Sequence, residues 1–231
     1  MVIAVSALLS LLFAAIVMAV EYWSKKIDVR HKRYIEKLIS FSAGVSITYA
    51  LLGLLPFFAE TALAIDKLLF FSLVFGFAIH HIVEKKIYQY NHRFQLLKVI
   101  SLEENIFYYI YHFILGIVLV TLTQQDMTAG ILLFVSIIFY TIIHNLPQES
   151  YKNKLKALFL STSTLVGAIF AVFIWTQRAL WIEFSLIGMA TGVVLFTVTR
   201  HHLPFGRKGD VRYFILGVIS YTALLILKGY V

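Results

Sequence analysis

The sequence lacks cysteine altogether and has few charged residues. None of the 231 residues is Cys, and Asp, Glu, Lys and Arg make up 14% of the chain, against about 25% in an ordinary soluble domain. The absence of Cys excludes disulfides, thiolate metal sites and thiol catalysis. The apolar fraction is 60%, which excludes a soluble globular enzyme, because a soluble interior cannot bury so much apolar surface. We therefore expect lipid to be the solvent of most of the chain.

Several catalytic patterns are missing as well. The sequence contains no Gly-rich phosphate loop, no Gly-x-Ser-x-Gly and no His-Glu-x-x-His. Its basic loops lack a nucleic-acid-binding module, so no nucleic-acid partner is expected. An intramembrane hydrolase would need a Ser–His or Asp–Asp pair at matching depth, and the pattern does not provide one. We therefore expect neither an enzyme nor a bound cofactor.

What the sequence does contain is a series of apolar segments. A helix crossing about 30 Å of hydrocarbon needs about 20 residues. Eight segments approach or exceed this length: 2–22, 38–59, 68–83, 105–123, 127–147, 155–176, 179–199 and 213–227. The connections are too short for a soluble domain. The pattern predicts an all-α polytopic membrane protein with eight transmembrane helices in one domain, 1–231, its first segment a span rather than a cleaved signal peptide.

Basic residues alternate between the loops and predict the orientation of the spans. Of the 20 Lys and Arg residues, 17 fall in the first, third, fifth and seventh loops. They are Lys25, Lys26, Arg30, Lys32, Arg33, Lys37, Lys85, Lys86, Arg93, Lys98, Lys152, Lys154, Lys156, Arg200, Arg207, Lys208 and Arg212. The other side has Lys67, Arg178 and Lys228. The positive-inside rule therefore predicts an integral protein of the cell (inner) membrane with both termini on the non-cytoplasmic side.

A short pattern recurs in the second and seventh segments. Gly44 precedes Pro56 by 12 residues, and Gly192 precedes Pro204 by the same interval. Segments five apart in an alternating topology run in opposite directions, so a true repeat would be inverted, as in many transporters. Segments 1–3 would then mirror 6–8, with 4 and 5 at the pseudo-axis, a 3+2+3 arrangement. Chance similarity within an apolar background is the alternative.

Polar residues inside the membrane mark a candidate site between the fourth and fifth segments. His112 lies about 10 Å into the fourth segment, at 1.5 Å per residue, and His144 lies near the end of the antiparallel fifth. Gln148 shares a helix face with His144, while Asn145 and Glu149 form the adjoining row. Polar groups at this depth are costly, so we interpret them as functional, with interhelical hydrogen bonding as the alternative.

Taken together, these features resemble the ZIP family of divalent-metal transporters. That family has eight spans, both termini outside, a 3+2+3 inverted repeat and a metal site between helices 4 and 5. The segments Gly44–Pro56 and Gly192–Pro204 are similar to its helices 2 and 7. His144, Pro147 and Glu149 match its His-Glu-x-Pro-His-Glu motif. The resemblance implies a transporter whose substrate is a divalent transition metal such as zinc.

The departures from the family pattern limit the ligand set. Tyr111, His112 and Leu115 stand where the family motif has His, Asn and an acid, and only Gly116 clearly matches in this segment. With at most one carboxylate at the site, two metal ions would be prohibitively repulsive. We therefore expect a single ion. The expected ligands are His112, His144, Asn145, Gln148 and Glu149.

Two functions of different kinds remain open on the sequence alone. Imidazole ligands suit zinc, iron, nickel or copper better than calcium or magnesium, which favours a transition-metal transporter. The alternative is a ZIP-fold relative that has lost metal transport and serves as a binding or scaffold protein. The expected partners are the lipid bilayer and a divalent metal ion, and a homodimer is a further option that the sequence leaves open.

Overall fold

The computed structural model describes residues 2–25, 32–90, 93–145, 154–175, 179–202 and 209–229, and these are helical apart from short turns. The helices are α1 (Val2–Ser24), α2 (Lys32–Tyr49), α3 (Leu55–Ile65), α4 (Phe70–Tyr90), α5 (Arg93–Gln125), α6 (Met127–Asn145), α7 (Lys154–Ser161), α8 (Ser163–Ile169), α9 (Leu180–Thr197) and α10 (Val211–Leu227). Three π-helical turns are η1 (Ala50–Leu54), η3 (Phe170–Ile174) and η4 (Val198–His202), and η2 (Lys67–Leu69) is a 3-10 turn. The prediction of an all-α protein is confirmed.

The lengths of the apolar helices are consistent with a polytopic membrane protein. Five helical stretches are long and apolar enough to cross a bilayer, and three shorter ones are also apolar. The long stretches are Val5–Ser24, Tyr34–Ile65, Asn105–Gln125, Lys154–Ile174 and Leu180–Arg200, and the shorter ones are Lys67–Val83, Met127–Ile142 and Val211–Leu227. Many large apolar side chains on these helices are exposed, as expected of surfaces that face lipid rather than water.

Several helices differ from simple spans in ways that the apolar pattern did not predict. The second span continues from α2 through η1 into α3, and the sixth is interrupted between α7 and α8 and ends in η3. In η1 the backbone N–H of Leu55 bonds to the carbonyl of Ala50, five residues earlier. Because Pro56 follows and has no N–H to donate, the wider π turn accommodates the missing hydrogen bond.

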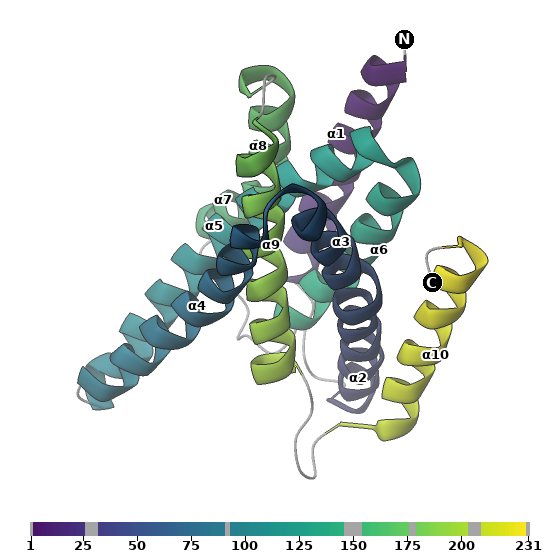
Figure 1. Ribbon diagram of the computed structural model, residues 1–231. Coiled ribbons are helices and arrows are strands. Elements are labelled where there is room, and N and C mark those ends of the chain that lie inside the picture. Colours follow the sequence, from purple (N-terminus) through teal and green to yellow (C-terminus); the bar gives the residue numbers. More distant parts are fainter. Residues whose placement is uncertain are drawn as a thin grey trace.

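The helices pack in pairs around α5 and α6. The closest pairs are α4 with α9, α2 with α10, and α5 with α8, while α6 packs against both α1 and α2. In Figure 1, α2 and α10 stand side by side, and α9 runs next to α4 and α5. Tyr221 of α10 donates a hydrogen bond of 2.6 Å to the carbonyl of Leu132 in α6, and Phe13 of α1 stacks on Phe134 of α6.

Glycines allow two of these pairs to cross at backbone contact, and the two crossings have the same pattern. A Cβ at Gly44 of α2 would meet the Phe214 carbonyl of α10, and a Cβ at Gly192 of α9 would meet the Leu73 carbonyl of α4. Both carbonyls belong to the residue three before a glycine on the partner helix. Only residues without a Cβ permit helix backbones to approach so closely.

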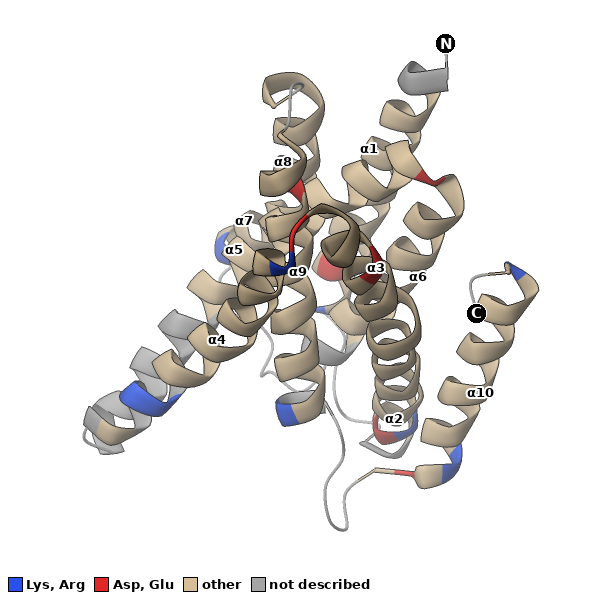
Figure 2. Cartoon of the chain, in the orientation of Figure 1, with Lys and Arg blue, Asp and Glu red and all other residues tan. Residues whose placement is uncertain are grey.

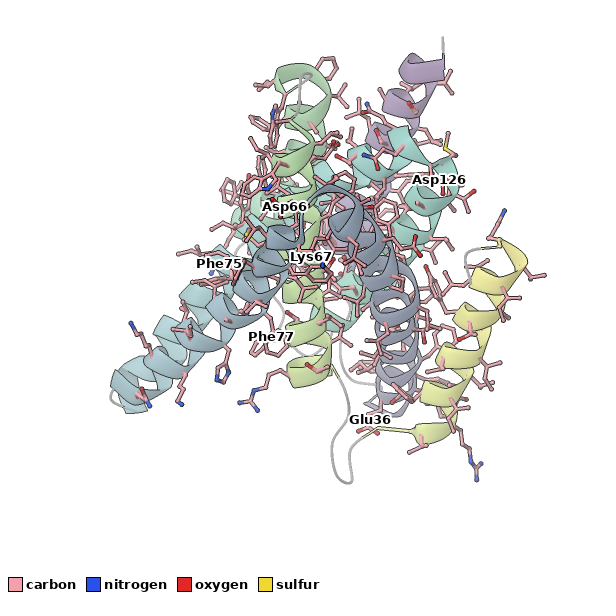
Figure 3. All side chains as sticks on the ribbon, viewed as in Figure 1. Glu36, Asp66, Lys67, Phe75, Phe77 and Asp126 are labelled. Carbon is pink, nitrogen blue, oxygen red and sulfur yellow. The ribbon has the colours of Figure 1, made fainter. Side chains whose placement is uncertain are left out.

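Two aspartates lie immediately before helical segments. Asp66 and Asp126 each accept a backbone N–H bond two residues on, from Leu68 and Thr128, at 2.8 and 2.9 Å; such bonds start helices. In Figure 3, Asp66, Lys67 and Asp126 lie towards the upper part of the bundle, whereas Glu36 lies at its lower end. Figure 2 shows Lys and Arg at the lower ends of α2, α4, α9 and α10, with fewer elsewhere.

Candidate functional site

His112 lies in a fully buried polar cluster between α1, α5 and α8. Its side chain is 0% exposed. Its Nδ1 atom lies 3.0 Å from the Thr164 hydroxyl of α8 and 3.9 Å from the Glu21 carboxylate of α1. This histidine is therefore buried in the bundle, and the two contacts above join it to the first and sixth spans.

Glu21 and Lys25 form the charged part of this cluster. They are 0% and 4% exposed, and the Lys25 ammonium lies 2.6 Å from Glu21 Oε1. The two residues are four apart on α1, a spacing that brings side chains together on one helix face. The same ammonium lies 3.3 Å from the Ser161 hydroxyl of α7. A buried charge that is paired and hydrogen-bonded in this way avoids most of its desolvation penalty.

Aromatic rings close the cluster on the α5 side. The Tyr108 ring stacks on His112 with centroids 4.0 Å apart, and the Lys25 ammonium lies 5.0 Å from the centre of the Tyr108 ring. An ammonium in front of an aromatic face is attracted by the electrons of the ring. Carboxylate, hydroxyl and ring together provide the surroundings of a bound cation, and the cation in this structure is Lys25.

Burial also changes the protonation equilibrium of Lys25, which follows the last residue of the Val5–Ser24 span. Burial lowers the pKa of the Lys25 ammonium below its ordinary value of 10.5, while the neighbouring Glu21 carboxylate raises it. Removal from water disfavours the charged ammonium, and the adjacent negative charge favours it. The ion pair therefore depends on Glu21 to keep Lys25 charged.

The remaining predicted metal ligands fall at or beyond the end of α6. His144 and Asn145 are its last two residues, but their side chains are outside the described part of the chain, as are Gln148 and Glu149 altogether. Among the side chains that the structure describes, no three His, Asp or Glu residues converge. The proposed meeting of His112 with His144 thus remains a prediction, with the Tyr140 ring of α6 lying 6.0 Å from the His112 ring.

The adjoining face of α5, towards α2, α6 and α9, carries no described charged group. A small cavity with room for about one water molecule lies between α2, α5, α6 and α9. Its walls include Ser46, Tyr49, Tyr111, Leu115, Ser136 and Tyr140. The Tyr111 and Tyr140 rings meet edge to face at 5.5 Å. The described lining of this cavity therefore offers hydroxyl groups and carbon but no carboxylate or imidazole.

Histidines at the end of the third span have a packing role. The His80 ring lies 5.2 Å from Phe107 of α5 and 5.0 Å from Phe196 of α9, and His81 is exposed. His201 and His202 end η4, and nothing is described of their side chains.

Sequence reasoning did not identify Glu21 or Lys25 as site residues. Glu21 ends a long apolar run, and Lys25 was counted only among the basic residues that orient the first loop. The available signal was an acid–base pair at a spacing of four residues across the end of a membrane span. Comparison with known proteins adds no assignment, since no protein-family model and no curated protein matches the sequence.

Proposed function

We propose that the protein is a ZIP-like membrane transporter that moves a divalent transition-metal ion across the membrane, through a site between the fourth and fifth spans. In the structure these spans are α5 and α6, which pack against each other near the middle of the helix arrangement. Polar residues inside membrane-spanning helices are energetically costly and are therefore functional candidates. Both helices contain such residues.

The observation that carries this proposal is the matched geometry of the second and seventh spans, which supports an inverted repeat. Gly44 lies six residues before η1, and Gly192 lies six residues before η4. Each glycine crosses its partner helix at the same kind of contact. Pro56 follows η1, and in the sequence Pro204 follows η4 at the same interval.

An inverted repeat has a mechanical consequence. Two structurally similar halves of opposite orientation can exchange conformations, so that a site near the midplane opens first to one side and then to the other. In the proposed arrangement, segments 1–3 and 6–8 are these halves, and α5 and α6 lie between them. The π turns are the positions where each half can bend, because their hydrogen bonding is already displaced from the α-helical pattern.

The metal ligands proposed for this route are His144, Asn145, Gln148 and Glu149, with His112 contributing from α5. Imidazole and carboxylate donors bind zinc and similar ions at about 2.0–2.2 Å. The basic loops support an orientation with both termini outside the cytoplasm. Cysteine labelling tests it directly in this Cys-free chain: Asp28→Cys should react with impermeant reagents only after the cells are opened, and labelling from outside would reverse the topology.

One observation favours the second candidate, a ZIP-fold relative that binds partners without transporting metal. Tyr111 and Leu115 fill the space between α2, α5, α6 and α9 where a metal route would require ligands. The route proposed above must therefore rely on residues nearer the end of α6. If those residues bind no metal, the binding or scaffold role is the better account.

Uptake into proteoliposomes tests the proposal. Purified wild type should admit zinc to an indicator inside the vesicles, and His144→Ala should abolish most of the uptake because it removes the strongest expected ligand. His81→Ala is the matched control, since this histidine is exposed and lies outside the proposed route. Equal uptake by both variants would mean that the site is wrong. Absence of zinc and cobalt uptake by wild type would favour the scaffold role.

A further inference from the structure

The Glu21–Lys25 pair has the arrangement of an occupied cation site rather than of a surface salt bridge. The ammonium of Lys25 is surrounded by the Glu21 carboxylate at 2.6 Å, the Ser161 hydroxyl at 3.3 Å and the Tyr108 ring at 5.0 Å. Both charged side chains are almost completely removed from solvent, with exposures of 1% and 0%. The buried Glu21 carboxylate is therefore paired with a cation from the same chain, the Lys25 ammonium.

The same carboxylate also faces an imidazole. Glu21 Oε2 lies 3.9 Å from His112 Nδ1. Two donors that bind a tetrahedral zinc ion at about 2.0–2.2 Å lie about 3.3–3.6 Å from one another. The Glu21 and His112 donors already have nearly this separation, and the Thr164 hydroxyl lies 3.0 Å from the same nitrogen.

We propose that Glu21 and His112 are ligands of a cation site between α1, α5 and α8, and that Lys25 fills this site as an internal competitor of a divalent transition-metal ion. The ion binds when the Lys25 side chain moves out. A carboxylate and an imidazole form a donor pair that zinc and cobalt accept, with the nearby hydroxyls or water completing the coordination.

Competition follows from charge. An ammonium and a divalent ion near one carboxylate carry three positive charges against one negative charge. At short range in a protein interior, the repulsion between the two cations exceeds the attraction that one carboxylate provides. Only one of the two cations can therefore occupy the site at a time. Lys25 is suited to leaving, because it directly follows the end of α1 and has a long flexible side chain.

This inference rests on the proposed function only in the choice of metal. The site shares His112 with the proposed route, but it also uses Glu21 from the first span, which is not among the ligands proposed for that route. In a transporter, a site that alternates between a tethered ammonium and a free ion would refill itself when the metal leaves, so that Glu21 is never left unpaired. Lys25 therefore neutralises Glu21 in the empty state and lies outside the site in the loaded state.

Cobalt titration followed by visible absorption tests the site in the purified full-length protein. Lys25→Ala should bind cobalt at least about tenfold more tightly than wild type, because the competing charge is gone. Lys25→Ala with Glu21→Gln should lose this gain. Lys154→Ala is the matched control, since Lys154 is exposed on α7, and it should behave as wild type. Equal cobalt affinity in Lys25→Ala and wild type would overturn the proposal.

A measurement on wild type keeps the test independent of how well Lys25→Ala folds. Zinc should raise the rate at which an amine-reactive reagent modifies Lys25, read by mass spectrometry, relative to Lys154 in the same sample. A rate unchanged by zinc would overturn the proposal. The two proposals also fail separately: cobalt binding by Lys25→Ala should persist with His144→Ala added, and it should persist even if wild type transports no metal.

Discussion

Two adjoining faces of α5 differ in charge, although the residues on them are close neighbours in the sequence. On one face, His112 contacts Glu21 and Thr164, and Glu21 holds the Lys25 ammonium. On the other face, Tyr111 and Leu115 line a cavity that contains no described charged group. The buried charges of the described chain gather on the face towards α1 and α8.

This difference predicts on which face of α5 substitutions should destabilise the protein most. The uncharged face can be held by packing alone, since tyrosines and leucine fill space at little electrostatic cost. The charged face cannot, because each buried charge is costly unless its partner stays in place. Substitutions on the two faces should therefore differ in size, and the following predictions test that difference with the free energy of unfolding in mixed micelles.

The largest effect is expected for Glu21→Ala. This change removes the carboxylate and leaves the Lys25 ammonium buried without its ion-pair partner, which should cost about 3–5 kcal/mol of the free energy of unfolding. Glu60→Ala is the matched control, because Glu60 is exposed and its removal should change stability by no more than about 0.5 kcal/mol. Equal effects of the two substitutions would show that the buried ion pair does not contribute more to stability than an exposed carboxylate does.

Much of the fold could be predicted from the sequence, because the signals were local. Apolar runs predicted the helical class, and the spacing from Gly44 to Pro56 drew attention to the stretch where η1 forms. Helix length outside the membrane was not predictable in this way. The apolar pattern predicted neither the start of α5 at Arg93 nor the break between α7 and α8. Both depend on polar residues and packing, which an apolar pattern does not record.

The site was harder to predict, because it depends on partners from different helices. The depth of His112 indicated that it is buried, but not that its neighbours come from α1 and α8. Glu21 was missed since one acid at the end of an apolar run is usually solvated at the headgroups. Its burial follows from the close approach of α5 and α8, where a Cβ at Gly116 would meet the Thr164 carbonyl.

A smaller effect is expected at that crossing. Gly116→Ala would force α5 away from α8, because the added Cβ would meet the Thr164 carbonyl and the Ala168 nitrogen, at a cost of about 1–3 kcal/mol. The neighbouring Leu115 points to the uncharged face, and Leu115→Met keeps its volume, so it should cost less than about 1.5 kcal/mol. A larger loss from Leu115→Met than from Gly116→Ala would reverse the ranking of the two faces.

The smallest effect compares one hydroxyl on each face. Thr164→Val keeps the shape of the side chain but removes the hydroxyl that lies 3.0 Å from His112 Nδ1, which should cost about 1 kcal/mol. The Ser46 hydroxyl at the cavity has no hydrogen-bond partner among the described residues. Because a buried hydroxyl without a partner opposes folding, Ser46→Ala should leave the free energy of unfolding unchanged or raise it slightly. A loss from Ser46→Ala as large as that from Thr164→Val would mean that water in the cavity binds Ser46, so that both faces of α5 depend on polar contacts.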